Sequence, residues 1–402
     1  MKRALFSMIT ASAVFGFPIA GSSQPPTGTF PVIVIFREAV SLQPHRSVYH
    51  ADDRAQANPE AWSYLDHGVA GAVQLLEARH GFRSEHVYSA SIRGFSARLT
   101  ARQIVDIESD PAVAYVEADG TMSIVAQTLP WGINRIDADT SSTRAGNGSG
   151  AVNNVNAYVL DTGVDASHGD LNVIGHVDFA SGPNRDCNGH GTHVAGTAAA
   201  RDNTLDVVGV SPGTPVTGVK VLGCGGTGAT SGVIKGVDWV TANADKPAVA
   251  NMSLGGGASN ALDSAVKQSA NSGVFYAVAA GNSGASACNE SPARAGTHNG
   301  VATVAATNMG DNEPSWSNYG NCVDIWAPGV SILSTRKGGG TTTKSGTSMA
   351  SPHVAGTGAL YLSSHTGASA ATVESSLKAS AVSTGTTSKD GRQIRLVYAG
   401  NY

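Results

Sequence analysis

The first third of the chain shows a strand-like and then a helical spacing of apolar residues. Residues 32–36 form a short run rich in β-branched side chains, and a helical spacing follows at Trp62, Leu65, Val69, Ala72, Val73 and Leu76. A second strand-like stretch (87–99), a short helix (104–107) and a strand (112–116) complete the series. This β-α-β-α-β order, with room for one more strand, predicts a small α+β unit of ferredoxin-like type over residues 30–125.

Residues 126–402 follow a different pattern, in which short apolar runs alternate with segments of helical spacing. The runs cover residues 155–160, 216–222, 248–254, 274–279 and 301–306, and the helical segments cover 190–200, 231–242, 261–272 and 348–363. This alternation predicts an α/β fold with a mostly parallel central sheet flanked by helices on both faces. A functional site in such a sheet lies beyond the carboxyl ends of the strands.

The N-terminus has the pattern of a signal peptide. Lys2 and Arg3 precede a mostly apolar run over residues 4–20, and the small residues Gly21, Ser22 and Ser23 follow. A first helix of the fold is the alternative, but the basic start and small-residue exit favour a signal peptide over residues 1–23. No other stretch is long and apolar enough to cross a membrane. We therefore expect a secreted, extracellular protein whose mature form is free of the membrane.

Composition narrows the class of protein. Only 14% of the 402 residues are charged and 49 are Gly, which suits a compact, loop-rich globule rather than a disordered chain. The net charge of -4 comes without long runs of either sign, so a nucleic-acid partner is not expected. The four cysteines of an exported chain predict two disulfides, and their spacing alone leaves three pairings open.

Three short motifs carry residues suited to amide hydrolysis. Asp161 follows the run 155–160 in Asp-Thr-Gly, His190 opens a helical segment in His-Gly-Thr-His, and Ser348 opens another in Gly-Thr-Ser-Met-Ala. A serine at a helix start is exposed where the helix dipole favours negative charge. His190 is then the base that takes its proton, and Asp161 fixes the imidazole tautomer.

The chain order Asp…His…Ser separates this set from other serine hydrolases. An α/β-hydrolase has the order Ser…Asp…His and a chymotrypsin-like protease the order His…Asp…Ser. The three motifs, in this order, resemble the signatures of the subtilase (subtilisin-like serine protease) family. The resemblance implies a serine endopeptidase acting on proteins and peptides.

A fourth segment, Ala-Ala-Gly281-Asn282, resembles the part of the family that supplies the oxyanion hole. By this resemblance Asn282 donates its side-chain N–H to the tetrahedral oxyanion, beside the backbone N–H of Ser348. Gly281 is assigned to substrate binding in the same segment. Without the other three motifs, an Asn in a Gly-rich turn would be the simpler interpretation.

Two further stretches resemble the substrate-binding strands of the family. One is Ser253-Leu254-Gly255 and the other is Gly226-Thr227-Gly228. Glycine allows a peptide backbone to approach closely, and strand addition needs free N–H and C=O groups. Because small and apolar residues dominate both stretches, we expect an uncharged pocket and broad cleavage after apolar or aromatic residues.

The cysteine spacing resembles the proteinase K-like branch, especially its aqualysin-type enzymes. That resemblance implies the pairs Cys187–Cys224 and Cys288–Cys322. Val194 stands where the typical proteinase K pattern has a free cysteine, which again favours the aqualysin type. Cys187, His190 and His193 also have metal-like spacing. A zinc site is nevertheless disfavoured, because His190 is needed as the base and no fourth ligand lies nearby.

Calcium is the cofactor that the resemblance implies. Asp324, in Val-Asp-Ile-Trp-Ala-Pro-Gly, matches a family aspartate that binds a structural ion together with backbone carbonyls. Oxygen ligands on a loop suit Ca²⁺. The other calcium-binding segments of the family are not clearly matched, so one site is expected.

The unit over residues 30–125 resembles an inhibitor-type propeptide. Gly94-Phe-Ser-Ala-Arg-Leu and Asp110-Pro-Ala-Val-Ala-Tyr-Val-Glu carry this likeness. The resemblance implies that the propeptide assists folding, inhibits the cleft and is removed by self-cleavage near Val125 and Ala126. The peptidase domain then covers residues 126–402, and a monomer is the default expectation.

Two other functions compete with a broad endopeptidase. A processing protease with narrow specificity needs acidic pocket residues to hold basic side chains, and the two stretches assigned to substrate contain none. A subtilase-like binding protein would lack a member of the triad, and none is missing.

Overall fold

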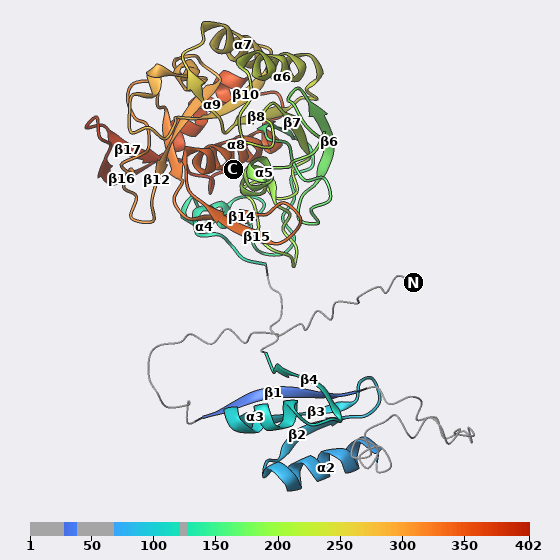
Figure 1. Cartoon of the computed structure of the whole chain (residues 1–402). Helices are drawn as coiled ribbons and strands as arrows, with labels where there is room; N and C mark the ends of the chain where they lie inside the picture. The colour runs from blue at the N-terminus through green and yellow to red at the C-terminus, as the bar shows by residue number, and fades with distance from the viewer. Residues whose placement is uncertain (1–27, 38–67, 121–126) are drawn as a thin grey trace, which may run out of the picture. The chain divides into compact units, whose positions relative to one another are not determined.

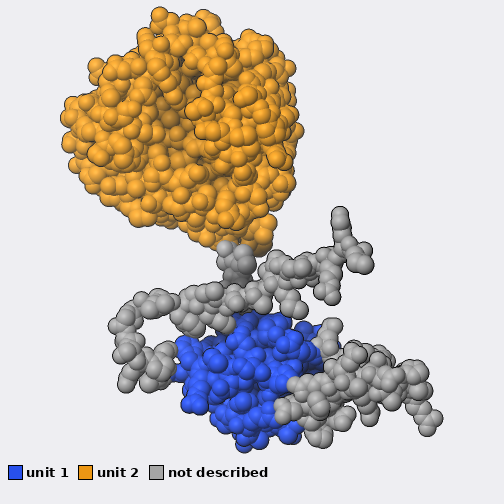
Figure 2. Space-filling view, viewed as in Figure 1, with its two compact units in different colours: residues 1–123 blue, residues 124–402 orange. Residues whose placement is uncertain are grey.

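The chain forms two compact units, residues 1–123 and 124–402 (Figures 1 and 2). A computed structural model describes residues 28–37, 68–120 and 127–402. Three predicted features lie outside the described residues. They are the signal peptide, the cleavage point near Val125, and the start of the first predicted helix with Trp62 and Leu65.

In its described residues, the first unit is a four-stranded antiparallel sheet with two helices. The strand order is β2-β3-β1-β4, formed by β1 (Thr29–Phe36), β2 (Ser84–Tyr88), β3 (Gly94–Thr100) and β4 (Val113–Ala118). The helices are α2 (Gly68–His80) and α3 (Ala101–Glu108). Val34, Phe95 and Leu99 are fully buried in its core. The predicted strand over residues 87–99 is therefore two strands, which supply the additional strand that the pattern allowed.

The second unit is built on a nine-stranded sheet with the order β16-β17-β13-β12-β10-β8-β5-β7-β6. Every neighbouring pair is parallel except β16 with β17. The five apolar runs of the sequence become β5 (Asn156–Asp161), β7 (Val216–Lys220), β8 (Ala248–Met252), β10 (Val274–Ala279) and β12 (Val301–Thr307). The predicted mostly parallel sheet is confirmed.

Helices cover both faces of this sheet. Successive residues of a strand point to opposite faces, and each face packs against its own set of helices in a separate core. Val159 packs in one core with residues of α5 (His190–Ala199), α8 (Thr347–Ser364) and α9 (Ala370–Ser380). Its neighbours Tyr158 and Leu160 pack in the other core with residues of α6 (Thr230–Asn243) and α7 (Asn260–Asn271). The helices α6 and α7 lie side by side (Figure 1).

The remaining elements are short or polar, and the hydrophobic pattern did not predict most of them. They are α4 (Trp131–Arg135), β6 (Val173–Asp178), β9 (Gly256–Gly257), β11 (Glu290–Ser291), β13 (Ile325–Pro328), β14 (Ile332–Thr335), β15 (Thr341–Lys344), β16 (Val382–Thr387) and β17 (Gln393–Leu396). β14 and β15 form an antiparallel hairpin just before α8. Among the described residues, no helix is both long and apolar enough to span a membrane.

Candidate active site

Asp161 and His190 meet where β5 ends and α5 begins. The Nδ1 atom of His190 lies 2.8 and 2.9 Å from the two carboxylate oxygens of Asp161. Asp161 is fully buried, and its carboxylate also accepts the backbone N–H of Thr162 at 2.7 Å. The Asp161 charge raises the pKa of His190, against the opposing effect of burial. This contact places the proton of the neutral imidazole on Nδ1 and leaves Nε2 as the basic nitrogen.

Ser348 is the second residue of α8, where unpaired backbone N–H groups give the helix end a partial positive charge. Its hydroxyl donates to the carbonyl of Ser253 at 3.1 Å, and the Ser253 hydroxyl donates to the Ser348 carbonyl at 2.7 Å. Ser348 and His190 line the same cleft. Hydrogen bonds between nucleophile and base often shorten only when substrate binds.

The side chain of Asn282 is oriented by Thr347, the residue before Ser348. Its Oδ1 accepts the backbone N–H of Thr347 at 2.8 Å and the Thr347 hydroxyl at 3.0 Å. With its oxygen held in this way, the amide nitrogen of Asn282 is the group available to a negative charge near Ser348. Gly281 donates its N–H to the Thr347 hydroxyl at 3.1 Å and has a φ of 104°, which suits glycine.

A cleft of about 390 Å³ brings together most of the residues that the sequence predicts to bind substrate. Gly226, Thr227 and Gly228 line it together with Ser253, Leu254 and Gly255, and with His190 and Ser348. Leu222, Val233 and Leu262 add apolar surface, and the described lining contains no Asp, Glu, Lys or Arg. Gly281 is not among the lining residues; its contacts are with the segment that holds Asn282.

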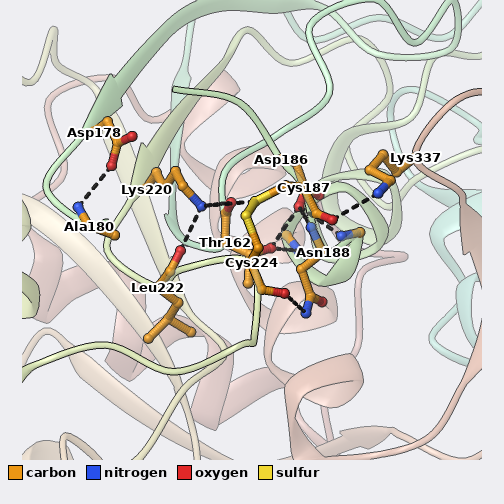
Figure 3. Close-up of a disulfide and its surroundings, with 12 residues drawn as sticks. Thr162, Asp178, Ala180, Asp186, Cys187, Asn188, Lys220, Leu222, Cys224 and Lys337 are labelled. Atoms are coloured by element: carbon orange, nitrogen blue, oxygen red, sulfur yellow. Dashed lines mark hydrogen bonds between the residues drawn. A yellow bond between two sulfur atoms is a disulfide. The ribbon is translucent and has the colours of Figure 1, made fainter. Parts of the chain in front are cut away.

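One of two disulfides joins two segments that contribute residues to the lining of the cleft. Cys187 in the loop before His190 is bonded to Cys224, close to Gly226, and Asn188 donates to the Cys224 carbonyl at 2.9 Å (Figure 3). The second disulfide is Cys288–Cys322. Because Cys187 is oxidised, the metal-like spacing of Cys187, His190 and His193 does not form a zinc site.

His193 and His353 have structural surroundings. The Nε2 of His193 contacts the carbonyls of Ile332 and Thr342 at 3.0 and 3.1 Å, and Nδ1 of His353 contacts the Met349 carbonyl at 2.9 Å. Burial lowers the pKa of each to about 4. Both imidazoles are therefore neutral at pH 7.

The surroundings of Asp324 do not fit the calcium ion expected from the sequence. Its Oδ1 accepts from the ammonium of Lys378 at 2.7 Å, and its Oδ2 accepts the Thr303 N–H at 3.0 Å. Lys378 also binds Glu374 at 3.0 Å. A divalent cation at this carboxylate would be repelled by the ammonium already in contact with it. No group of three or more His, Cys, Asp or Glu side chains in the described part of the chain is arranged to hold a metal.

Sequence reasoning missed Asp186 and Lys220, two buried charges beside the site. Asp186 precedes Cys187 in a polar loop, where no periodicity marks it. Lys220 stands in the apolar run 216–222, and a charge inside a buried strand is a signal that could have identified it.

Known proteins resemble the chain in both units. Residues 153–396 match the model of the subtilase family, and residues 32–124 match that of peptidase inhibitor I9. The chain is 40% identical over 373 residues to an extracellular serine proteinase of Thermus sp. (strain Rt41A), covering 90% of this chain and 87% of the relative. An alkaline protease of Alkalihalobacillus alcalophilus is 40% identical over 399 residues, 97% of each chain.

Two further matches are partial. Alkaline serine exoprotease A of Vibrio alginolyticus is 45% identical over 346 residues, which are 82% of this chain and 62% of the relative. The crystal structure of a cold adapted subtilisin-like serine proteinase matches with a TM-score of 0.60 and 43% identity, covering 67% of this chain and 98% of that structure. The family model alone covers more than half of the chain. The chain therefore belongs to the subtilase family of subtilisin-like serine endopeptidases, with an N-terminal I9 inhibitor segment.

Proposed function

We propose that Asp161, His190 and Ser348 form the catalytic triad of an endopeptidase that hydrolyses peptide bonds in proteins. The observation that carries this proposal is the contact of both Asp161 carboxylate oxygens with Nδ1 of His190. It leaves Nε2 of His190 to take a proton, in a cleft that also contains Ser348.

Each step of the reaction has a group suited to it. Nε2 of His190 takes the hydroxyl proton of Ser348 as Oγ attacks the substrate carbonyl carbon. The Asn282 amide and the Ser348 backbone N–H stabilise the oxyanion that forms. The imidazolium, held by Asp161, then gives its proton to the departing amine, and water repeats the sequence on the acyl-enzyme. Loss of the Asn282 donor should lower kcat by about 10²- to 10³-fold.

We propose broad specificity with a preference for apolar side chains. A substrate strand would lie between residues 226–228 and 253–255, where glycines permit close approach of the backbone. The uncharged lining of the cleft supports apolar or aromatic side chains at the cleaved position. It gives no support to a processing protease that selects basic residues.

We further propose that the protein is secreted as a precursor. Residues 1–23 are the signal peptide, and residues 30–125 are the propeptide that aids folding and inhibits the cleft until Ser348 cuts near Val125. The match to peptidase inhibitor I9 and the printed name of the extracellular Thermus relative support this. We expect the mature protein to be a monomer with no nucleic-acid or membrane partner.

The test compares the intact mass of the secreted wild type with that of Ser348→Ala. Wild type should begin near Ala126, gain one adduct from a serine-directed covalent inhibitor and then lose caseinolytic activity. The variant should retain the propeptide. A purified Ser348→Ala protein that still matures by itself would exclude self-cleavage by Ser348.

A further inference from the structure

Two buried charged side chains outside the proposed triad bind opposite ends of one residue. Asp186 is 3% exposed and Lys220 is 0% exposed. The Asp186 carboxylate accepts the Thr162 hydroxyl at 2.9 Å, and the Lys220 ammonium donates to the Thr162 carbonyl at 2.8 Å (Figure 3). Thr162 directly follows Asp161, so both charges act on the residue next to the carboxylate that holds His190.

Asp186 also binds the segment that carries His190. Its carboxylate accepts the backbone N–H groups of Asn188, Gly189 and Thr192 at 3.0, 2.7 and 3.0 Å, and the Thr192 hydroxyl at 2.5 Å. The Thr162 hydroxyl in turn accepts the N–H of Gly191 at 3.0 Å. One carboxylate thus connects the loop after Asp161 with residues on both sides of His190.

Lys220 connects the same loop with the cleft. Its ammonium donates to the Leu222 carbonyl at 2.7 Å, and Leu222 lines the cleft. The sulfur of Cys187 lies 3.8 Å away. Among the described residues, Lys220 forms no salt bridge with a carboxylate, although burial of an unpaired ammonium is costly. Its charge is satisfied by backbone carbonyls, which it holds in place.

We propose that Asp186 and Lys220 are positioning residues. They bind the side chain and the backbone of Thr162 and so hold the adjacent Asp161 in contact with His190, and Lys220 also holds Leu222 beside the cleft. This inference rests on the proposed triad. Displacement of a catalytic group by about 1 Å costs roughly 10²-fold in rate. The two residues therefore act through distance and orientation and do not touch the substrate.

The contacts predict different kinetic losses for the two residues. Asp186→Asn places an amide N–H among five donors, which loosens the Asp161–His190 geometry, and it should lower kcat by about 10- to 100-fold with KM retained. Lys220→Met also releases the carbonyl of Leu222, a residue that lines the cleft, so it should lower kcat and raise KM. Asp178→Asn is the matched control. Asp178 lies opposite Lys220 in the strand register, but its carboxylate accepts the Ala180 N–H at 2.8 Å (Figure 3).

A pH profile separates positioning from a general structural defect. The charges that act on His190 are Asp161 at the end of β5, Lys344 on β15 and Asp186, and the neutral His193 follows it on α5. Removal of the Asp186 charge lowers the pKa of His190, so the acidic limb of kcat/KM should move to lower pH. A purely structural defect lowers activity equally at every pH.

The experiment uses full-length chains, secreted and titrated with a covalent serine inhibitor so that rates refer to assembled sites only. Thr162→Val removes the shared hydroxyl at nearly constant volume, and it provides a milder variant if Asp186→Asn is not secreted. If the two residues act on kcat through the position of Thr162, the kcat of the double variant should be no lower than that of the slower single variant. Additive losses, or an Asp186→Asn enzyme with the kcat and pH profile of Asp178→Asn, would overturn the inference. A wild type without a titratable serine would instead refute the proposed triad.

Discussion

Two regions of the peptidase unit contain the same components but connect them differently. Beside the cleft lie the Cys187–Cys224 disulfide, Asp186 and Lys220, and farther along the chain lie the Cys288–Cys322 disulfide, Asp324 and Lys378. In the second region the lysine binds the carboxylate directly at 2.7 Å. In the first region the two charges bind the backbone and side chain of Thr162 instead.

This difference indicates what each region does. A direct ion pair neutralises its charges locally and ties α9 to the loop before β13, so it serves stability. Charges that bind neutral peptide and hydroxyl groups set the position of those groups, and the Asp186 charge also raises the pKa of His190. We therefore expect substitutions in the first region to change activity, and substitutions in the second to change stability with activity retained.

The largest effect is expected for Asp161→Asn. An amide cannot stabilise the imidazolium of His190 and favours the wrong tautomer, so kcat should fall by about 10⁴-fold. Steady-state kinetics on inhibitor-titrated enzyme measure this loss, and thermal unfolding shows whether the fold persists. A loss below tenfold would separate Asp161 from the catalytic groups.

Removal of each disulfide compares the regions directly. The bridged cysteines are 37 and 34 residues apart, so the chain-entropy model gives a similar loss of about 4 kcal/mol in unfolding free energy for each paired Cys→Ser variant. Only the Cys187→Ser/Cys224→Ser variant should also lose kcat, because its bridge lies beside His190. Denaturant unfolding and kinetics on both variants test this, and equal kinetic effects would contradict the distinction.

Lys378→Met should destabilise the protein and leave kcat unchanged. It removes the cation from the buried carboxylates of Asp324 and Glu374, at a cost of about 1–2 kcal/mol, because the Lys378 side chain is 42% exposed and solvent screens the pair. The midpoint of urea unfolding reports the change. The same measurement with added Ca²⁺ shows whether Asp324 and Glu374 bind a metal once Lys378 is gone. In the wild type the Lys378 ammonium opposes such binding.

The smallest effect is a displacement of the pH profile. Because the Asp161 charge raises the pKa of His190, the imidazole remains protonated to a higher pH than an ordinary histidine. Activity requires the neutral base, so kcat/KM should fall as pH decreases through this raised pKa. A profile that stays flat to pH 4 would contradict His190 as the base.

The Lys344→Gln variant provides a matched test in the other direction. Lys344 carries a charge that lowers the pKa of His190, so its removal should move the acidic limb of kcat/KM to higher pH.

The hydrophobic pattern predicted the sheet because five buried strands are nearly continuous apolar runs. The same pattern could not predict β15, since Thr341–Lys344 is polar and is defined by its pairing with β14. The candidate site followed from short motifs whose residues are adjacent in sequence. The contacts of Thr162 with Asp186 and Lys220 join residues 24 and 58 positions apart, so no local pattern contains them.

The contacts of Asp324 could not be predicted from the sequence for a similar reason. A motif identifies a carboxylate on a loop, but its partner Lys378 lies 54 residues further along the chain. A short motif identifies the charged side chains within its own few residues. The group that neutralises them depends on which helix the fold brings beside the loop.

His193 connects the elements that carry the proposed base and nucleophile, so we expect them to unfold together on heating. Its single Nε2–H is shared between the carbonyls of Ile332 and Thr342, one on each strand of the hairpin that leads to Ser348. The helix that carries the proposed base, His190, is thereby hydrogen-bonded to the hairpin that precedes the proposed nucleophile, Ser348. Local opening of either one breaks this contact, so the two should exchange their protected amide hydrogens as one cooperative unit. We therefore expect heat inactivation to be a single event, in which the proposed base and nucleophile separate together.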